Sequence, residues 1–307
     1  MPPNPRYSPF QTSAKALQVA GPYTANLTRL QPEIPLGRSV FMLHGLMGKA
    51  ASFYNAQTQV GLASYLAQAG YDVYLAELRG RGLTGPELKH LNFSLQDALK
   101  VDVPVLIEEF LHQNNNQPSF WLGQGLGSLL LTSYLAENTS LLSQPQGLIH
   151  FSPQTLSQAE GFKNKLWFNL VEQKGVNQLA KLLGYVPAVK LKLGQANEHL
   201  GFYQEAKSWL AKFWQNTSSN TYVKRLQEQS LPPSLYFAQS SKLNLNNATS
   251  TRNFMFNLGE HNARLIKLGK KLGNQKNYKN QLLCLDPQAE TDFYPLLLNW
   301  LDEIATN

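Results

Sequence analysis

The sequence predicts an α/β protein in which a mostly parallel central sheet is flanked by helices and interrupted by an inserted helical cap. Short segments that are apolar at nearly every position alternate with longer segments of helical periodicity. Strands that are apolar on both faces are typical of parallel sheets covered by helices on both sides. The alternation stops near residue 155 and resumes near residue 231, which indicates an insertion.

The elements of the first half follow from this alternation. Residues 1–35, rich in proline and threonine, indicate an irregular or edge-strand lead-in. Gly70 closes one predicted helix, since glycine is common just after a helix end. Buried strands are predicted at 39–45, 71–78, 119–123 and 147–153, and helices at 61–70, 97–112 and 128–138.

The second half contains the insertion and the end of the sheet. Residues 155–230 carry several aromatic side chains at helical spacing, so we expect a helical cap there. The core of the fold is then divided between residues 1–154 and 231–307. The predicted elements of the returning core are a strand at 233–239, a helix within 247–259, closing strands or loops at 263–269 and 280–286, and a last helix over Tyr294–Ile304.

Amides supply much of the polarity of this chain. It contains 25 Asn and 25 Gln against 47 Asp, Glu, Lys and Arg together, and 15% of its residues are charged where about a quarter is usual. Only six Asp and six His are present, which restricts any mechanism that needs them. The net charge of +7 reflects scarce acids rather than clustered bases, so we expect no nucleic-acid partner.

Several kinds of site are excluded by the sequence. A single cysteine, Cys284, rules out an internal disulfide and a cysteine-based zinc site. No His, Asp and Glu residues have the spacing of metal ligands, and we expect no metal and no cofactor. No apolar run reaches the ~18 residues of a transmembrane helix, and the start of the chain lacks a signal-peptide pattern. These features predict a cytoplasmic location.

Three motifs at the ends of predicted strands carry a family resemblance. They are LHGLMG at Leu43–Gly48, DVYLAELRGRG at Asp72–Gly82 and FWLGQGLGS at Phe120–Ser128. They are similar to the His-Gly oxyanion loop, the D-x-R-G-x-G loop and the nucleophile elbow of lipases and esterases. On these motifs the chain resembles the α/β-hydrolase fold from about Arg38 to its C-terminus. The resemblance implies a Ser-Asp-His triad and backbone N–H groups that bind an oxyanion.

The residues at the three triad positions depart from the family. Small residues stand two before and two after the nucleophile of such an elbow, and the glycines of this motif place the nucleophile at Gly125, which has no oxygen. The family pattern places the acid at Ser241 and the histidine at Asn280, or at Glu290 in a second alignment. Loss of the serine or histidine typically lowers turnover by ~10⁶-fold. The resemblance therefore predicts a degenerate triad.

Other hydroxyl and imidazole groups have structural interpretations beside catalytic ones. Ser128 lies one helical turn beyond the elbow, where we expect it to pack helix against sheet, and Ser152 has no identifiable base. We expect His44 to shape the oxyanion loop, His150 to be a hydrogen-bonded core residue, and His261 to be solvated on a helix.

Backbone N–H groups can bind a ligand even when the side chains of the triad are absent. The resemblance implies an oxyanion hole formed by the N–H groups of Leu46 and Leu126. The candidate binding residues are His44, Gly45, Leu46, Gln124 and Leu126.

Three functions remain open at this point. We favour a pseudohydrolase that binds a small apolar, acyl or carboxylate ligand, or a protein partner, without hydrolysis. The alternative is an enzyme that uses a non-triad mechanism, with residues drawn from His44, Ser128, Ser152 and Glu290. The third is an interaction protein with a basic surface, whose densest basic stretch contains Lys267, Lys270, Lys271, Lys276 and Lys279.

Overall fold

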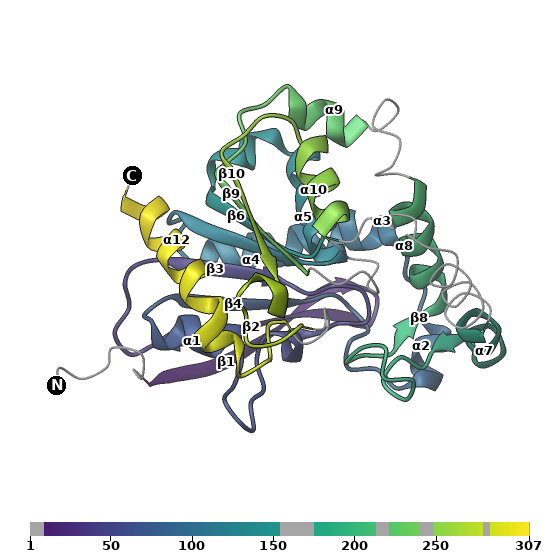
Figure 1. Ribbon diagram of the computed structural model, residues 1–307. Coiled ribbons are helices and arrows are strands. Elements are labelled where there is room, and N and C mark those ends of the chain that lie inside the picture. The colour runs from purple at the N-terminus through teal and green to yellow at the C-terminus, as the bar shows by residue number, and fades with distance from the viewer. Residues whose placement is uncertain (1–8, 154–174, 213–220, 240–247, 279–282, 307) are drawn as a thin grey trace.

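A mostly parallel sheet forms the centre of the molecule (Figure 1). The computed structural model describes residues 9–153, 175–212, 221–239, 248–278 and 283–306. Within them the sheet has eight strands in the order β1-β2-β4-β3-β5-β6-β9-β10, parallel from β4 onward. The strands are β1 (Phe10–Ala20), β2 (Tyr23–Pro32), β3 (Ser39–Leu43), β4 (Asp72–Glu77), β5 (Ser119–Gln124), β6 (Pro145–Phe151), β9 (Ser234–Gln239) and β10 (Ala263–Leu268). The predicted α/β class is confirmed.

The start of the chain differs in part from its prediction. β1 and β2 form a long antiparallel hairpin, and β2 also pairs antiparallel with β4. β1 is an edge strand, which is one of the two predicted forms of this segment, and residues 1–8 lie outside the described residues. Most β1 side chains are exposed, and Leu17 is the buried one. A strand with so little buried surface leaves only a weak hydrophobic pattern in the sequence.

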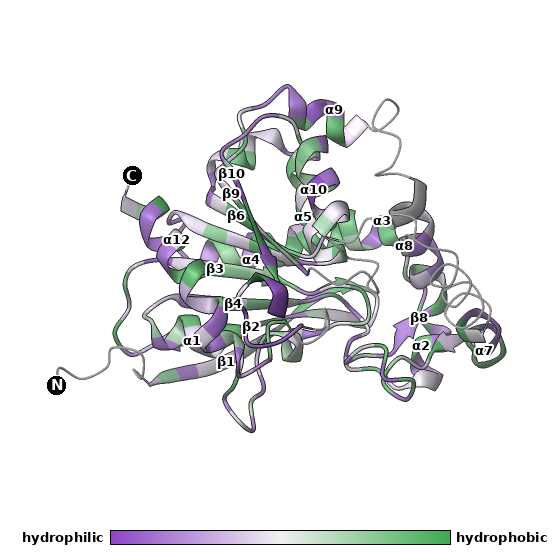
Figure 2. Cartoon of the chain, viewed as in Figure 1, coloured by the Kyte–Doolittle hydropathy of each residue, from purple (hydrophilic) through white to green (hydrophobic). Residues whose placement is uncertain are grey.

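Helices cover both faces of the sheet. Alternate strand residues point to opposite faces, so Phe41 packs among α4, α5 and α10, while the adjacent Met42 packs among α1 and α12. Figure 2 shows the hydrophobic colour running along α5, which is buried on nearly all sides. The helices of the core are α1 (Leu62–Gln68), α2 (Gly85–His90), α3 (Leu95–Asp97), α4 (Val103–Gln113), α5 (Leu126–Glu137), α10 (Ala248–Asn257), α11 (Ala289–Asp292) and α12 (Tyr294–Thr306).

Short helical turns complete the core. They are the 3₁₀ turns η2 (Ala50–Ser52), η4 (Thr139–Ser143) and η6 (Lys270–Leu272), and the π-helical turn η3 (Ala98–Asp102). η3 runs directly into α4, whose second residue is Pro104. Proline cannot donate the usual i→i−4 hydrogen bond, which accounts for a widened turn before it.

The chain between β6 and β9 contains helices and a small two-stranded sheet. Its described elements are α7 (Val176–Leu183), β7 (Tyr185–Val186), β8 (Glu198–His199), α8 (Leu200–Lys212) and α9 (Thr221–Gln227). α7, α8 and β8 gather beside α2 at one end of the sheet, whereas α9 lies near α5 (Figure 1). The predicted boundaries of a cap at 155 and 230 fall in this part of the chain and remain predictions.

The buried side chain of His150 makes no hydrogen bond within the part of the chain that the structure describes. His150 on β6 stacks on the ring of Tyr236 on β9, with ring centres 4.8 Å apart, and meets the edge of Phe254 on α10. Neither ring nitrogen has a hydrogen-bond partner among the described residues, so the expectation of a hydrogen-bonded core residue is wrong. The side chain is held by aromatic stacking, and burial lowers its pKa to about 3.

The neighbouring His261 also differs from its prediction. It follows α10 in a loop instead of lying on a helix, and it is not merely solvated. Its Nε2 lies 2.9 Å from the Tyr236 hydroxyl, and its Nδ1 lies 2.8 Å from the Gly259 carbonyl oxygen. The two histidines therefore contact the same tyrosine, one by stacking and one by hydrogen bonding.

We expect His150→Phe to stabilise the protein. Phenylalanine keeps the aromatic contacts and removes two buried polar atoms without partners, which is worth about 1–2 kcal/mol in the free energy of unfolding. The folded protein keeps this ring neutral, while the unfolded chain protonates it below its ordinary pKa of 6.5. Above pH 6.5 the ring is neutral in both states, whereas between pH 6.5 and 3 only the unfolded state binds the proton, so the wild type loses stability as pH falls. The advantage of the variant should therefore grow by about 1.4 kcal/mol per pH unit over this range.

Denaturant unfolding at pH 7.5 and pH 5.5 measures both effects. His261→Phe is the matched control, because it removes hydrogen-bonded nitrogens beside the same tyrosine and should destabilise at pH 7.5. A His150→Phe variant less stable than wild type at both pH values would contradict this interpretation.

Candidate functional site

The turn between β5 and α5 has the backbone geometry of a nucleophile elbow. Gly125 stands between strand and helix with φ 54° and ψ −119°, a conformation that side-chain-bearing residues rarely adopt. Its N–H donates to the Phe151 carbonyl on β6 (2.9 Å), and its carbonyl accepts from Ser128 N–H (3.1 Å). The turn is thus held from both sides at a position that carries no side chain.

The flanking glycines are required by close approach of the backbone. A Cβ atom on Gly123 would lie 2.4 Å from the Cα of Ser128. A Cβ atom on Gly127 would lie 2.3 Å from the carbonyl oxygen of Leu43, at the end of β3. These contacts bring β5, α5 and the loop after β3 together.

The loop after β3 lies against the elbow. Residues 45–48 form a turn closed by a 3.0 Å hydrogen bond between its first and last residues, with Met47 in the left-handed region at φ 56°. A Cβ atom on Gly45 would lie 2.9 Å from the carbonyl oxygen of Gln124, the residue before the elbow. The candidate donor Leu46 therefore belongs to a loop that touches the elbow.

The second candidate donor begins helix α5. Leu126 is buried and is the first helical residue, so its N–H has no acceptor within the helix. Gln124 ends β5 with a partly exposed side chain. Four of the five candidate binding residues, Gly45, Leu46, Gln124 and Leu126, thus lie on the two segments that meet at Gly125.

His44, the fifth candidate, is held by the backbone. Its Nδ1 lies 2.8 Å from the Gly45 carbonyl oxygen, and Leu78 N–H donates to its Nε2 at 3.2 Å. Because a carbonyl only accepts and an amide only donates, the proton of the neutral ring is on Nδ1. Burial and the nearby Arg81 charge lower the pKa of His44 to about 3. Both ring nitrogens are therefore occupied in fixing the loop.

The other hydroxyl and carboxyl candidates lie at separate places. Ser128 is fully buried, and its Oγ donates to the Gly123 carbonyl at 2.7 Å. Ser152 is buried after β6, with its Oγ 3.5 Å from the Phe237 carbonyl oxygen. Glu290 lies on α11, where burial raises its pKa. The triad positions Ser241 and Asn280 lie outside the described residues.

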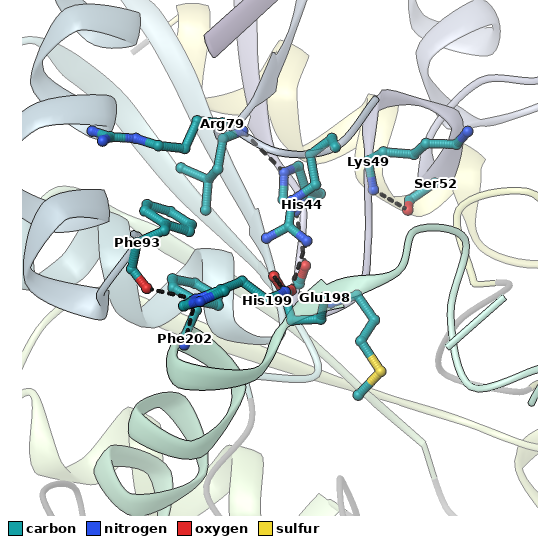
Figure 3. A network of polar contacts seen from close by, with 12 residues as sticks. His44, Lys49, Ser52, Arg79, Phe93, Glu198, His199 and Phe202 are labelled. Atoms are coloured by element: carbon teal, nitrogen blue, oxygen red, sulfur yellow. Dashed lines mark hydrogen bonds and ion pairs between the residues drawn. The ribbon is translucent and has the colours of Figure 1, made fainter. Parts of the chain in front are cut away.

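The sequence did not point to two buried ion pairs beside this site. Figure 3 labels one member of each pair, Arg79 and Glu198. Arg79 binds Asp102 through its backbone N–H and its guanidinium, and Arg81 Nη1 lies 2.6 Å from Glu198 Oε2. All four side chains are almost completely buried. Arg79 and Arg81 belong to the glycine-rich loop after β4. The motif in this loop predicted that the two arginines lie near the site, but it did not predict which carboxylates they bind.

Stacked aromatic rings join the two arginines. Phe93 and the α8 residue Phe202 stack with ring centres 4.7 Å apart and planes 3° apart. The Arg79 guanidinium lies 5.1 Å from the centre of the Phe93 ring, and that of Arg81 lies 5.7 Å from the Phe202 ring. Cation–π contact with desolvated rings stabilises both charges. The loop after β4 is therefore packed against the β6–β9 part of the chain.

Among the residues that the structure describes, no three His, Cys, Asp or Glu side chains are arranged to hold a metal ion. In that part of the chain, every helix is too short or too polar to span a bilayer.

Comparison with known sequences identifies relatives of this chain. A family model described as "Serine aminopeptidase, S33" matches residues 36–199. Human gastric triacylglycerol lipase is 27% identical over 137 residues, which cover 42% of this chain and 34% of that lipase. Human lipase member K is 26% identical over 110 residues, covering 34% of this chain and 28% of that protein. The chain spans about a third of the length of the curated relatives it matches.

Solved structures resemble the chain over nearly its whole length. A soluble variant of monoglyceride lipase from Saccharomyces cerevisiae, in complex with a substrate analogue, has a TM-score of 0.65 at 14% identity and covers 99% of both chains. A lipase-like protein from Acinetobacter baumannii has a TM-score of 0.57 at 16% identity, covering 97% of this chain and 93% of that chain. At these identities the likeness concerns the fold alone, and it confirms the α/β-hydrolase fold.

Gly127→Ala should be strongly destabilising because its methyl group would enter the backbone of the loop after β3. We expect a loss of about 3 kcal/mol in the free energy of unfolding, at the upper end of overpacking effects. Gly82→Ala is the matched control, since nothing lies within 4 Å of its Cβ position, and it should change stability by less than about 0.5 kcal/mol. Equal stability of the two variants in urea unfolding would contradict the close approach of these segments.

Proposed function

Because the chain belongs to the serine aminopeptidase S33 family and has the α/β-hydrolase fold, we propose that it is a pseudohydrolase that binds an acyl ligand without hydrolysing it. Gly125 carries this proposal. The elbow keeps the conformation in which a nucleophile would stand, yet position 125 has no oxygen that could attack a carbonyl. The residues predicted for the acid and the base, which are Ser241 and Asn280, or Glu290 in the second alignment, support the same conclusion because none of them completes a Ser-Asp-His triad.

An enzyme with a non-triad mechanism is the alternative, and the contacts of its candidate residues disfavour it. Both nitrogens of His44 are engaged with backbone groups, and its low pKa makes it a poor base near neutral pH. Ser128 and Ser152 are buried and directed to backbone carbonyls. Glu290, whose pKa is raised by burial, is the member of this set to test by substitution.

The ligand class follows from the donors that the site keeps. The N–H groups of Leu46 and Leu126 do not depend on the triad, and the start of α5 favours an oxygen with negative charge. The related proteins are named for triacylglycerol and monoglyceride. We therefore propose a ligand with an acyl chain and a terminal carbonyl or carboxylate, such as a monoacylglycerol or a fatty acid.

The chain between β6 and β9 is proposed as the cap over this ligand, and the cytoplasmic location stays a prediction.

An interaction protein with a basic surface has less support. Lys276 forms an ion pair with Asp286, which neutralises part of that stretch, and Lys279 lies outside the described residues.

The proposal predicts no esterase activity in the wild type or in Gly125→Ser. Hydrolysis of p-nitrophenyl butyrate should match a heat-denatured control for both proteins, because a serine without its base is a weak nucleophile. Serine at φ 54° should also cost about 1–3 kcal/mol of stability. Gly125→Ala is the control, since it has the same backbone strain without an oxygen. Turnover by the serine variant but not by the alanine variant would show a surviving base and contradict the proposal.

The oxyanion-type donor can be tested by comparing Leu126→Pro with Leu126→Ala. Both remove the buried leucine side chain, but only proline removes the N–H, and the first helical position tolerates proline. We expect the proline variant to bind oleate or monooleoylglycerol about tenfold more weakly than the alanine variant, the effect of one hydrogen bond to a charged or polarised oxygen.

Isothermal titration calorimetry gives both affinities. Equal affinities of the two variants would contradict a role for this N–H. No binding of either compound by the wild type would contradict the proposed ligand class.

A further inference from the structure

The turn at residues 45–48 holds a methionine in a conformation that favours glycine. Met47 is the third residue of a four-residue turn and has φ 56°. A positive φ at this position is the mark of a type II turn, where glycine or asparagine is usual. Met47 therefore keeps this conformation only if its surroundings fix it.

A distant segment of the chain fixes Met47. Its carbonyl accepts hydrogen bonds from Gln195 N–H (2.9 Å) and Ala196 N–H (3.0 Å), and its own N–H donates to Glu198 Oε2 (3.2 Å). A Cβ atom on Gly194 would lie 2.5 Å from the Met47 carbonyl oxygen, so the two backbones are in direct contact. Both backbone polar groups of Met47 are thus bound by residues 194–198.

The Glu198 carboxylate is itself fixed by Arg81. Their side chains are 2% and 1% exposed, and Figure 3 shows Glu198 beside the loop that carries His44. Glu198 Oε1 also accepts from His199 N–H (3.2 Å). Arg81 leaves Nε and Nη2 without partners among the described residues. The pair thus connects the loop after β4 to Met47, because Glu198 binds both Arg81 and the Met47 N–H. It does so although Arg81 is incompletely hydrogen-bonded.

Side-chain packing joins the same parts. Leu46 and Met47 pack against a small cluster made by the β6–β9 part of the chain, which includes Val186 and Tyr203. Leu46 and Met47 therefore join that part of the chain to the loop beside Gly125.

We propose that Glu198 and Arg81 are positioning residues that hold the 45–48 turn and keep the Leu46 N–H in place beside Gly125. This inference rests on the proposed function, because Leu46 matters as a ligand donor. A displacement of residues 194–198 would release Met47 and withdraw that donor. Ligand affinity is then set by a contact outside the elbow.

The test replaces both members of the pair. Removing one partner leaves a buried unpaired charge and is strongly destabilising, whereas apolar residues of similar size at both positions are tolerated. The variant is Glu198→Leu with Arg81→Met. Met47→Gly is then added, because glycine adopts the turn without external support. Met47→Ala on the same background is the control, since it shortens the side chain and keeps the unfavourable conformation.

Two readouts separate this inference from the proposed function. Hydrogen–deuterium exchange of the ligand-free protein reports on peptides that cover residues 44–50 and 193–198, with a peptide from β5 as reference. Calorimetry with oleate reports the affinity. We expect faster exchange in both peptides and about tenfold weaker binding in the double variant. Met47→Gly should restore protection of 44–50 and an affinity within about threefold of wild type, whereas Met47→Ala should restore neither.

Unchanged exchange in the double variant would overturn the inference. Equal rescue by glycine and alanine would also overturn it, because the pair would then act through packing instead of the turn. Wild-type protein that binds no oleate, with exchange changed and rescued as expected, would refute the proposed ligand and leave the positioning of the turn supported.

Discussion

Close approach of three backbone segments is the constraint on which the site depends. Cβ atoms at Gly45, Gly123 and Gly127 would all lie within 3 Å of a neighbouring backbone atom. β3, β5 and α5 therefore meet at a distance that no side chain permits, and α5 is buried on nearly all sides against the sheet. The strand-to-helix turn then has little freedom, and Gly125 takes the left-handed conformation that joins them. The backbone donors around this turn are consequences of packing, and they persist whatever side chain stands at position 125.

Buried charges connect this packed centre to the rest of the chain. The sequence has few charged residues, yet Arg79–Asp102 and Arg81–Glu198 place four of them in the interior. Such pairs contribute little net stability compared with apolar residues of the same size. They do fix which surfaces meet, because each carboxylate has a specific geometric partner. Both arginines come from the loop after β4, and the stacked Phe93 and Phe202 lie between them. This loop is therefore one junction between the core and the β6–β9 part of the chain.

The sequence predicted the features that local pattern determines. Parallel strands are apolar on both faces, so β3, β5 and β9 were evident as short apolar runs, and glycine spacing located the elbow. Contacts between distant residues left no such pattern. Glu198 is 117 residues from Arg81 and sits in a two-residue strand inside a region expected to be helical. The burial of His150 followed from its apolar strand, but its missing hydrogen bonds depend on Tyr236 and Phe254, which come from other parts of the chain.

Gly125 and Met47 both have a positive φ, but they support different conclusions about the site. Gly125 adopts its conformation at little cost, so the elbow can persist through packing alone, and its geometry is no argument that the site still works. Met47 is different, because a methionine at φ 56° is strained where glycine would fold the same turn more easily. That strain is maintained by an incompletely hydrogen-bonded buried arginine and a carboxylate from a remote segment. In the proposed positioning role, the conformation of Met47 depends on residues 194–198, so Met47, more than the elbow, links the proposed ligand donor to a distant segment of the chain.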